Sequence, residues 1–214
     1  TRDAVDIPVE YGEDSMLLID TAGMRRKARI KNAVERYSVL RGLRAIERAH
    51  VVLAVLDASR KIAEQDKKIA GYGHNRGKAT VFVVNKWDLV EKSDETSREY
   101  RQTIADEFSF MTYAPVLFVS AKTGQRIMRL PEAVLEVRER QLQEIPTGEL
   151  NRIIREAVMM RPPPGRKGVK LRIYYGTQTR TAPPTFLLFV NDPELVHYSY
   201  ERYLKNVLRE HRDF

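Results

Sequence analysis

The chain has 214 residues, of which 43% are hydrophobic and 31% are charged. These proportions are ordinary for a globular protein, and the length allows one large domain or a standard domain with a small one. The sequence has no run of about 20 apolar residues, the length that a membrane-spanning helix requires, and no hydrophobic targeting segment at its beginning. It has no cysteine, which excludes disulfides and thiolate metal sites. Both features fit a cytoplasmic protein with no membrane partner.

The net charge of +8 is unevenly distributed along the chain. Residues 1–144 carry 25 Lys and Arg against 22 Asp and Glu, whereas residues 145–214 carry 12 against 7. The second segment therefore has a net charge of +5 in about half the length, which makes it the better candidate for contact with RNA. A solvated basic surface is the alternative interpretation of the same charge.

Apolar runs alternate with amphipathic stretches through residues 1–144, a pattern typical of a parallel sheet flanked by helices. Strands are predicted at residues 6–11, 15–20, 51–57, 79–84 and 114–120. Helices are predicted between them at residues 38–49, 64–73, 93–108 and 128–143. The near-continuous hydrophobicity of the runs at 51–57 and 79–84 indicates strands that are buried on both faces. The first segment is therefore predicted to be an α/β domain.

The pattern changes at residues 145–148, which read as a linker with Thr147 as the N-cap of the next helix. That helix carries its apolar residues on one stripe, at Leu150, Ile153, Ile154, Ala157 and Val158. Two strands are predicted at 170–176 and 185–191, followed by a helix with a second apolar stripe. Residues 145–214 are therefore predicted to form a small α+β domain.

The first motif with chemical meaning is Asp20-Thr21-Ala22-Gly23, directly after the predicted strand at 15–20. Open α/β sheets bind ligands at the carboxyl ends of their strands, which is where this motif falls. An aspartate there can reach a Mg²⁺ ion through water, and the glycine lets its backbone N–H approach a terminal phosphate. Alone, the pattern D-x-x-G is common by chance.

The second motif, Asn85-Lys86-Trp87-Asp88, follows the predicted strand at 79–84. Guanine presents N1–H and its exocyclic amine as adjacent donors, and the carboxylate of Asp88 can accept from both. Adenine has no such pair of donors, so this acid selects against it. Asn85 can bond the base and neighbouring loops, while the stem of Lys86 can cover the plane of the ring.

The third motif, Ser120-Ala121-Lys122, follows the predicted strand at 114–120. The backbone N–H of Ala121 is placed to donate to the guanine carbonyl. Three motifs in the order D-x-x-G, N-K-x-D, S-A-K, each at the end of a strand, predict a guanine-nucleotide site.

The three motifs are those of Ras-like, translation-factor-class GTPases. We find a closer resemblance to the second G domain of the Der (EngA) double-GTPase family in the strings TRDAVD, DTAGMRRK, YSVLR, EQDKKIAGY and VVNKWD. The end of the chain resembles the C-terminal KH-like domain of that family in the strings KLRIYYGTQ, PPTFLLFVNDPEL and SYERYL. The resemblance covers nearly the whole chain.

The resemblance implies a Ras-like (P-loop GTPase) G domain over residues 1–144 that lacks its first strand and phosphate loop. A KH-like domain whose closing strand is missing would follow over residues 145–214. The intact protein would bind GTP and GDP with Mg²⁺, hydrolyse GTP to GDP and phosphate, and act in assembly of the large ribosomal subunit. Its partners would be that subunit with its rRNA, and its own first G domain, upstream in the parent.

The nucleotide-binding residues that the resemblance implies are those of the three motifs, together with the residue after the first of them. They are Asp20, Thr21, Ala22, Gly23, Met24, Asn85, Lys86, Trp87, Asp88, Ser120, Ala121 and Lys122. Asp20 would hold the Mg²⁺ ion through water.

The sequence departs from the family pattern in its phosphate site. The 214 residues contain no G-x-x-x-x-G-K-[ST] string, the loop whose backbone N–H groups wrap the phosphates. We interpret the absence as truncation, so that the chain is a fragment, is itself inactive, and binds GTP and GDP only weakly.

A second departure is Met24, which stands where many relatives carry a glutamine that orients the attacking water. A thioether cannot donate to water, so no catalytic residue is assignable. We expect the intact protein to use a K⁺ ion held by switch I and the phosphate loop, as related GTPases do. Simple packing of Met24 is the alternative interpretation.

The string Gly165-Arg166-Lys167-Gly168 matches the G-x-x-G loop of RNA-binding KH domains. In those domains the loop joins two helices, whereas here it joins a predicted helix to a predicted strand. We therefore predict a turn at 165–168, and expect that RNA contact depends on scattered basic side chains.

Two other functions fit parts of the sequence. One is a ribosome- or RNA-binding module with a degenerate, non-hydrolysing G domain, against which the intact Asp20, Asn85, Asp88 and Lys122 argue. The other is a different GTPase on the same fold, such as a tRNA-modification enzyme, against which the strings at the end of the chain argue.

Overall fold

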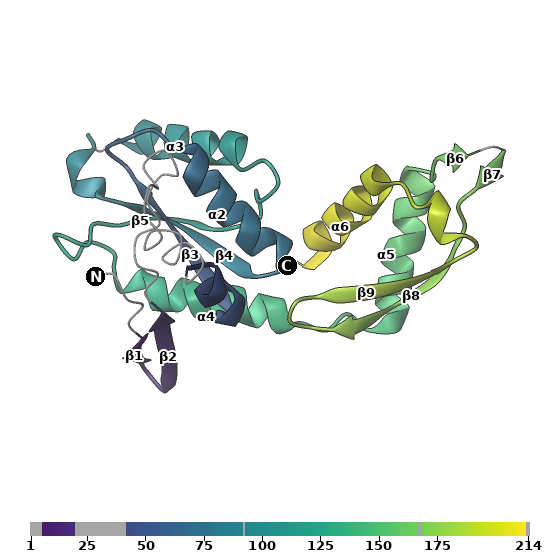
Figure 1. Ribbon diagram of the computed structural model, residues 1–214, viewed down its shortest axis with the longest axis horizontal. Coiled ribbons are helices and arrows are strands. Elements are labelled where there is room, and N and C mark those ends of the chain that lie inside the picture. Colours follow the sequence, from purple (N-terminus) through teal and green to yellow (C-terminus); the bar gives the residue numbers. More distant parts are fainter. Residues whose placement is uncertain (1–5, 20–41, 92, 167, 213–214) are drawn as a thin grey trace, which may run out of the picture. The chain divides into compact units, whose positions relative to one another are not determined.

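The computed structural model describes residues 6–19, 42–91, 93–166 and 168–212 (Figure 1). The chain divides into two compact units, Thr1–Arg138 and Glu139–Phe214. The division falls within helix α4 (Arg129–Leu142), whereas the boundary predicted from the sequence, after residue 144, follows the end of that helix.

The first unit is built on a parallel sheet of three strands in the order β3-β4-β5. These strands are β3 (Val51–Asp57), β4 (Ala79–Asn85) and β5 (Val116–Phe118). The register pairs Asp57 with Asn85, so the carboxyl ends of β3 and β4 lie side by side. The strands predicted at 51–57 and 79–84 are confirmed, and the predicted strand at 114–120 is shorter than expected. β4 is buried on both faces as predicted, whereas the same prediction is wrong for β3, which lies at an edge of the three-stranded sheet and leaves Val55 59% exposed.

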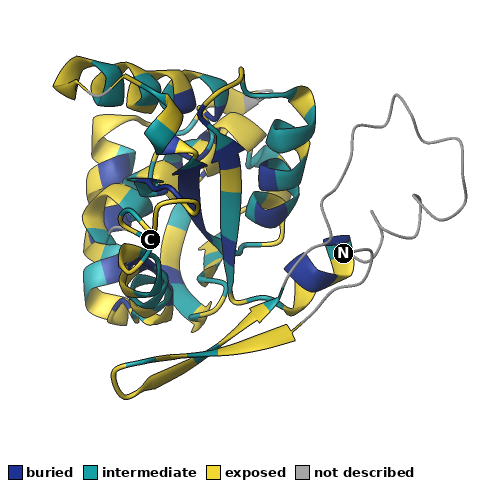
Figure 2. Cartoon of the chain, turned by 90° about the vertical axis from the view of Figure 1, so that its left-hand side faces the viewer, coloured by how far each residue is buried: buried dark blue, intermediate teal, exposed yellow. Residues whose placement is uncertain are grey.

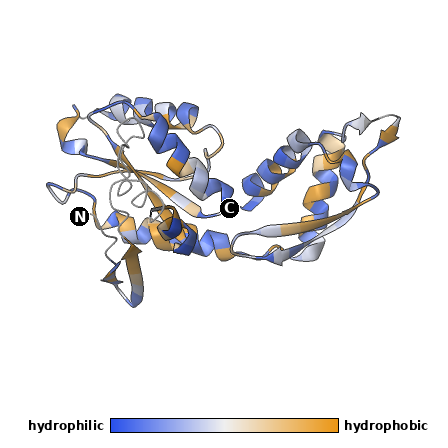
Figure 3. Ribbon diagram, in the orientation of Figure 1, coloured by the Kyte–Doolittle hydropathy of each residue, from blue (hydrophilic) through white to orange (hydrophobic). Residues whose placement is uncertain are grey.

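Helices cover both faces of this sheet. Phe82 and Val84 of β4 share a buried cluster with Ile104 of helix α3 (Asp94–Glu107) and Ala70 of helix α2 (Glu64–Asn75). The alternate residues of β4 pack on the other face, with two buried residues of α4; that cluster contains Val81, Val83, Ala133 and Val137. Because successive side chains of a strand point to opposite faces, a strand between two helical layers must be apolar throughout. In Figure 3 the strands of the sheet accordingly show the hydrophobic colour, while α3 is mostly hydrophilic.

The helices of the first unit begin close to the predicted residues. Ser93 caps α3, since its Oγ accepts a hydrogen bond from the N–H of Thr96 at 3.0 Å. Residues 42–48 are also helical, inside the helix predicted at 38–49.

An antiparallel hairpin precedes these elements, formed by β1 (Asp6–Tyr11) and β2 (Asp14–Ile19). Figure 2 shows that the residues of both strands are exposed or partly exposed. It forms its own two-stranded sheet, and Asp6 pairs with Arg48 at 2.8 Å between Oδ2 and Nη2. The predicted strand at 15–20 is confirmed to Ile19, whereas Asp20 lies outside the described residues.

The second unit contains helices α5 (Thr147–Met160) and α6 (Tyr198–Arg212) and two antiparallel hairpins. The hairpins are β6 (Gly165–Arg166) with β7 (Val169–Lys170), and β8 (Ile173–Arg180) with β9 (Thr185–Val190); the short helix η3 (Pro193–Leu195) precedes α6. The predicted α+β organisation is confirmed.

The predicted apolar stripes form the core of this unit. Leu150, Ile153, Ile154 and Ala157 of α5 are buried together with Tyr200, Leu204 and Leu208 of α6. Phe186 and Leu188 of β9 pack against them from one face of the β8–β9 ribbon. The stripes at i, i+3, i+4 spacing therefore identified the buried helix faces correctly.

One local prediction in this unit is wrong. Thr147 is the first residue of α5 rather than its N-cap, a position that Pro146 occupies without a side-chain hydrogen bond. Tyr174 and Tyr175 of β8 lie outside the core and are 64% and 47% exposed. Tyr175 instead stacks on Phe189 with ring centroids 4.2 Å apart, on the face of the ribbon opposite to Phe186.

The G-x-x-G string lies at the β6–β7 hairpin, between α5 and β8. Gly168 has φ +80°, a left-handed conformation that glycine adopts without steric cost. The turn predicted at this string is confirmed, and it does not join two helices.

Candidate functional site

The candidate site lies where β3, β4 and β5 end. Parallel strands bring their carboxyl ends to one edge of the sheet, so the residues that follow them become neighbours. The N–H of Ala58 donates to the carbonyl of Asn85 at 2.9 Å, and the N–H of Val119 donates to the carbonyl of Val84 at 2.9 Å. The edge therefore holds the second and third motifs against the residues after β3.

Asn85 joins the second motif to the third. Its Oδ1 accepts hydrogen bonds from the N–H of Lys86 at 2.7 Å and from the N–H of Ala121 at 3.0 Å. The sequence assigned the Ala121 N–H to a guanine carbonyl, but here it is directed at Asn85. The amide side chain thus fixes the spacing of the two loops.

Asp88 is oriented by the third motif. The hydroxyl of Ser120 donates to Asp88 Oδ1 at 2.5 Å and accepts from the N–H of Thr123 at 3.2 Å. Ser120 is fully buried, whereas Asp88 is half-buried. A buried hydroxyl that holds a partly exposed carboxylate leaves that carboxylate able to meet a ligand with a fixed direction.

The loop of the third motif closes on itself. The N–H of Ser120 donates to the carbonyl of Gln125 at 3.1 Å, and Gly124 has φ +76° at the turn. Lys122 lies exposed in this loop, near Ala121 in sequence. The loop presents Ala121 and Lys122 to solvent while its buried serine anchors it.

Trp87 anchors the loop of the second motif to the hydrophobic core. Its indole is 4% exposed and packs on Phe118, with ring centroids 4.3 Å apart, and on Tyr100, with centroids 5.3 Å apart. The backbone N–H of Trp87 donates to the carbonyl of Val119 at 3.0 Å. The indole therefore belongs to the core beneath the site.

Lys86 has a strained backbone, with φ 63° and ψ 31°. The left-handed region costs a residue with a Cβ about 1–2 kcal/mol, and such strain gathers at functional sites. The hydrogen bond from its N–H to Asn85 helps to hold it there. The side chain of Lys86 therefore leaves the loop in a fixed direction.

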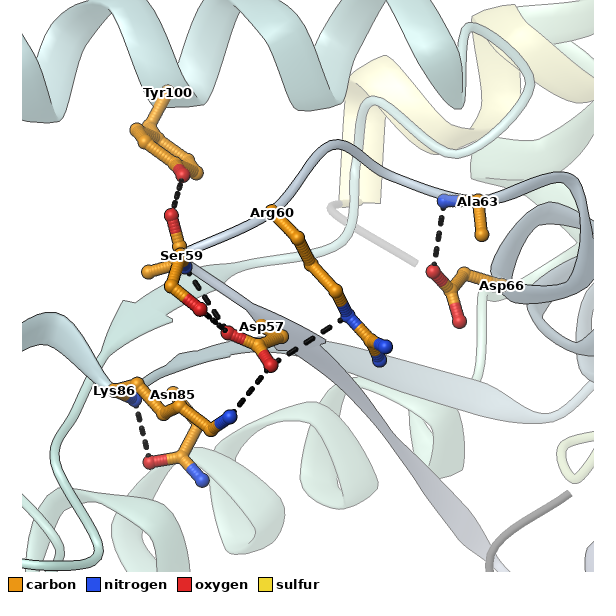
Figure 4. Close-up of polar contacts among 9 residues, drawn as sticks. Asp57, Ser59, Arg60, Ala63, Asp66, Asn85, Lys86 and Tyr100 are labelled. Carbon is orange, nitrogen blue, oxygen red and sulfur yellow. Dashed lines mark hydrogen bonds and ion pairs between the residues drawn. The ribbon is translucent and has the colours of Figure 1, made fainter. Parts of the chain in front are cut away.

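Asp57, the last residue of β3, completes the site, although it belongs to none of the three motifs (Figure 4). Its Oδ2 pairs with Lys86 Nζ at 2.7 Å, and its Oδ1 accepts from the Oγ of Ser59 at 2.6 Å. Hydrogen bonds from Lys86 and Ser59 lower the pKa of the Asp57 carboxyl from its ordinary 3.8 to about 2, because they stabilise the charged form. An acid that ends an apolar strand was the available signal.

The turn after Asp57 is tied to the neighbouring helices. The hydroxyl of Tyr100, on α3, donates to the carbonyl of Ala58. The N–H of Ala63 donates to Oδ2 of Asp66 at 2.9 Å at the beginning of α2 (Figure 4). Both contacts fix the path of the chain between β3 and α2.

The first motif, Asp20-Thr21-Ala22-Gly23, and Met24 lie outside the described residues. Within the described part of the chain, no three His, Asp or Glu side chains converge in a way that could hold a metal ion. The assignment of Mg²⁺ to Asp20 is therefore still a prediction. Of the described residues, no helix is long and apolar enough to cross a membrane.

Comparison with known families finds matches at both ends of the chain. The KH-domain-like family of EngA bacterial GTPase enzymes, C-terminal, matches residues 144–214, and the 50S ribosome-binding GTPase family matches residues 1–86. GTPase Der of Moorella thermoacetica is 57% identical over 98% of this chain and 48% of its own length. GTPase Der of Symbiobacterium thermophilum is 56% identical over 98% of this chain and 45% of its own length. The chain spans about half the length of these relatives.

Among solved structures, a crystal structure of Era in complex with MgGDPNP and nucleotides 1506-1542 of 16S ribosomal RNA has a TM-score of 0.57 and 19% identity. The similarity covers 100% of this chain and 75% of that chain. At this identity it shows the fold alone. Together with the family matches, it confirms the predicted fold class, a Ras-like GTPase domain followed by a KH-like domain.

Proposed function

The chain belongs to the Der (EngA) family of GTPases, and we propose that the intact protein binds GTP, hydrolyses it to GDP and phosphate, and acts in assembly of the large ribosomal subunit. We assign the two matched regions to the second G domain and the KH-like domain of that family. The proposed domains are residues 1–144 and 145–214.

The observation that carries the nucleotide assignment is the contact between the loops after β4 and β5. Ser120 holds the carboxylate of Asp88, and Asn85 holds the backbone of Ala121. A fixed, partly exposed carboxylate matches the adjacent N1–H and amine donors of guanine, and adenine offers no such pair. We assign guanine recognition to Asp88, with Asn85, Lys86, Ala121 and Lys122 around the base.

The proposed phosphate side of the site depends on the first motif. Asp20 would hold Mg²⁺ through water, with Thr21, Ala22 and Gly23 beside the terminal phosphate. The metal would neutralise charge on the phosphates. Met24 cannot orient water by donating a hydrogen bond, so we include K⁺ as a second ion of the intact protein.

The test is a nucleotide competition with the full-length protein, using a fluorescent GDP analogue. GTP and GDP should displace the analogue, whereas a large excess of ATP or ADP should not, because adenine has no donors that match Asp88. Purified protein should also release phosphate from GTP. The 214-residue chain alone, which lacks the G-x-x-x-x-G-K-[ST] string, should bind GDP much more weakly.

Two outcomes of that test would contradict the proposal. Displacement by ATP as readily as by GTP would remove the guanine assignment. Tight GTP binding with no phosphate release would favour the alternative function, a ribosome- or RNA-binding module whose G domain does not hydrolyse.

We propose RNA of the large ribosomal subunit as the partner of the second unit, acting in the cytoplasm. Residues 145–214 carry the greater share of the positive charge, +5 of +8. Lys170, Arg172 and Arg180 lie exposed on or beside the β6–β7 and β8–β9 hairpins. The first G domain of the parent is a further proposed partner.

RNA affinity should depend on these charges rather than on the G-x-x-G turn. Changing Lys170 and Arg172 to alanine together should weaken binding to all RNA sequences alike. The same change should reduce the slope of log affinity against log salt by about 1–2, since each cation neutralises about one phosphate. Fluorescence anisotropy with several RNA sequences over a series of salt concentrations measures both effects.

Gly165→Ala is the comparison for this experiment. An added Cβ would lie 3.3 Å from the carbonyl oxygen of Val169, a contact that a small shift of the hairpin relieves. RNA affinity should therefore change little. A larger loss from Gly165→Ala than from the basic pair, or strong preference for one RNA sequence, would indicate a KH-type clamp instead.

A further inference from the structure

The acid at the end of β3 and the lysine after β4 form a pair that the family motifs do not contain. Asp57 Oδ2 and Lys86 Nζ lie 2.7 Å apart, and the two residues are 29 positions apart in sequence. The parallel register that pairs Asp57 with Asn85 places them on the same edge of the sheet (Figure 4).

Asp57 is also held in place by contacts other than the one with Lys86. Its Oδ1 accepts from both the N–H and the Oγ of Ser59, at 3.0 and 2.6 Å. Its side chain is only 15% exposed, whereas that of Lys86 is 50% exposed. The carboxylate is therefore a fixed point, and the lysine is the group whose freedom the pair restricts.

A second cation near Asp57 contributes less. Arg60 Nε lies 3.5 Å from Asp57 Oδ2, and the Arg60 side chain is 61% exposed. At this longer distance the attraction is weaker than that of the 2.7 Å pair between Lys86 and the same oxygen. Lys86 is therefore the main partner of the Oδ2 oxygen.

The stem of Lys86 runs between two fixed ends. At its base, the backbone is locked in the left-handed conformation by the bond to Asn85. At its tip, the ammonium is held by Asp57. A flexible four-carbon chain fixed at both ends has lost its rotamer entropy before any ligand arrives, which is the general basis of preorganised binding.

We propose that Asp57 is a positioning residue of the guanine site, which holds the Lys86 side chain across the ends of β3 and β4 so that its stem is in place to cover the base. This role depends on the guanine assignment of Asp88 made above. Asp57 acts on the nucleotide through Lys86 and does not contact the base itself.

A double-mutant cycle in the full-length protein tests this role, with GDP affinity measured by fluorescence titration of a GDP analogue. Asp57→Ala should weaken binding about threefold to tenfold, because Lys86 regains its rotamers. Lys86→Met, which keeps the stem but removes the ammonium, should weaken binding by a similar factor. The double variant should bind no more weakly than either single variant, since both remove the same contact.

Two controls separate positioning from folding. Asp106→Ala removes an exposed acid of α3 that accepts a hydrogen bond from Gln102 at 2.8 Å, and GDP affinity should stay unchanged. Asp57→Asn keeps the shape of the side chain, so the cycle can be repeated with it if the alanine variant loses thermal stability. The asparagine variant should show a smaller loss of GDP affinity than the alanine variant.

Three results would overturn the proposal. If Asp57→Ala still weakened GDP binding in the Lys86→Met background, Asp57 would act through the fold of the turn at Ser59. If Asp57→Ala tightened GDP binding, the pair would be a contact that the nucleotide must break. If the unaltered protein bound no guanine nucleotide, the proposed function would fail and this role with it, whereas selective GDP binding with an additive cycle would remove Asp57 alone.

Discussion

Asp88→Asn in the intact protein should lower affinity for GDP and GTP by up to about a hundredfold and allow xanthine nucleotides to bind. Guanine offers two donors, and the amide nitrogen of an asparagine would face them without an acceptor. An unpaired polar contact of this kind costs about 1–3 kcal/mol. Xanthine has a carbonyl where guanine has its amine, so the same amide nitrogen can donate to it.

The structure adds a reason why the substituted side chain should keep its orientation. Ser120 donates its hydroxyl to Asp88 Oδ1 at 2.5 Å, and the carbonyl oxygen of an asparagine can accept that same hydrogen bond. The amide nitrogen is then left to face the base. Competition with GTP and xanthosine triphosphate measures the switch, and Asp106→Asn, the same chemical change on the exposed surface of α3, is the matched control. Unchanged preference for GTP would remove Asp88 from base recognition.

Phe82→Ala should destabilise the first unit by about 3–5 kcal/mol, the range for deletion of a buried aromatic side chain. Phe82 is 1% exposed in the middle strand of the sheet and packs on Phe108, with ring centroids 4.6 Å apart. Helices α2 and α3 cover this face, so the cavity cannot close without moving a helix.

Denaturant unfolding of the 214-residue chain measures the effect, with Trp87, its one tryptophan, as the probe. Trp87 belongs to the same buried cluster as Phe82, so its fluorescence follows this unit. Val55→Ala on β3 is the control, since Val55 is 59% exposed and should lose less than about 1 kcal/mol. A loss below that value for Phe82→Ala would mean that the sheet is not the centre of the core.

The sequence by itself predicted the elements in which apolar residues recur at a fixed spacing. The runs at 51–57 and 79–84 have no polar face and both form strands, but only β4, in the middle of the sheet, is covered on both sides, whereas β3 lies at an edge and leaves Val55 exposed. The apolar stripe of α5 follows the 3.6-residue period of a helix, and its residues are the core of the second unit. These signals are local, because they depend only on the spacing of apolar residues within one element.

Local signals were not enough where two faces of a ribbon carry similar residues. In β9 both faces carry apolar or aromatic residues, and β8 begins with Ile173, Tyr174 and Tyr175, so period-two alternation cannot tell which face meets the helices. The structure buries Phe186 against α5 and leaves Tyr175 and Phe189 stacked on the outer face. The irregular pairing between Ile173 and Tyr175 also shifts the register at that point.

For the candidate site, the sequence determined which residue types follow β4 and β5, because the N-K-x-D and S-A-K motifs state a base-recognition chemistry directly. The structure decided how they are connected: Asn85 reaches Ala121 across 36 positions, and Asp88 reaches Ser120 across 32. Asp57 carries no motif of its own, and its role becomes visible only when β3 lies beside β4 and brings its carboxylate to Lys86. Hydrogen bonds and ion pairs act over about 3 Å, so partners far apart in sequence become partners only through the tertiary fold.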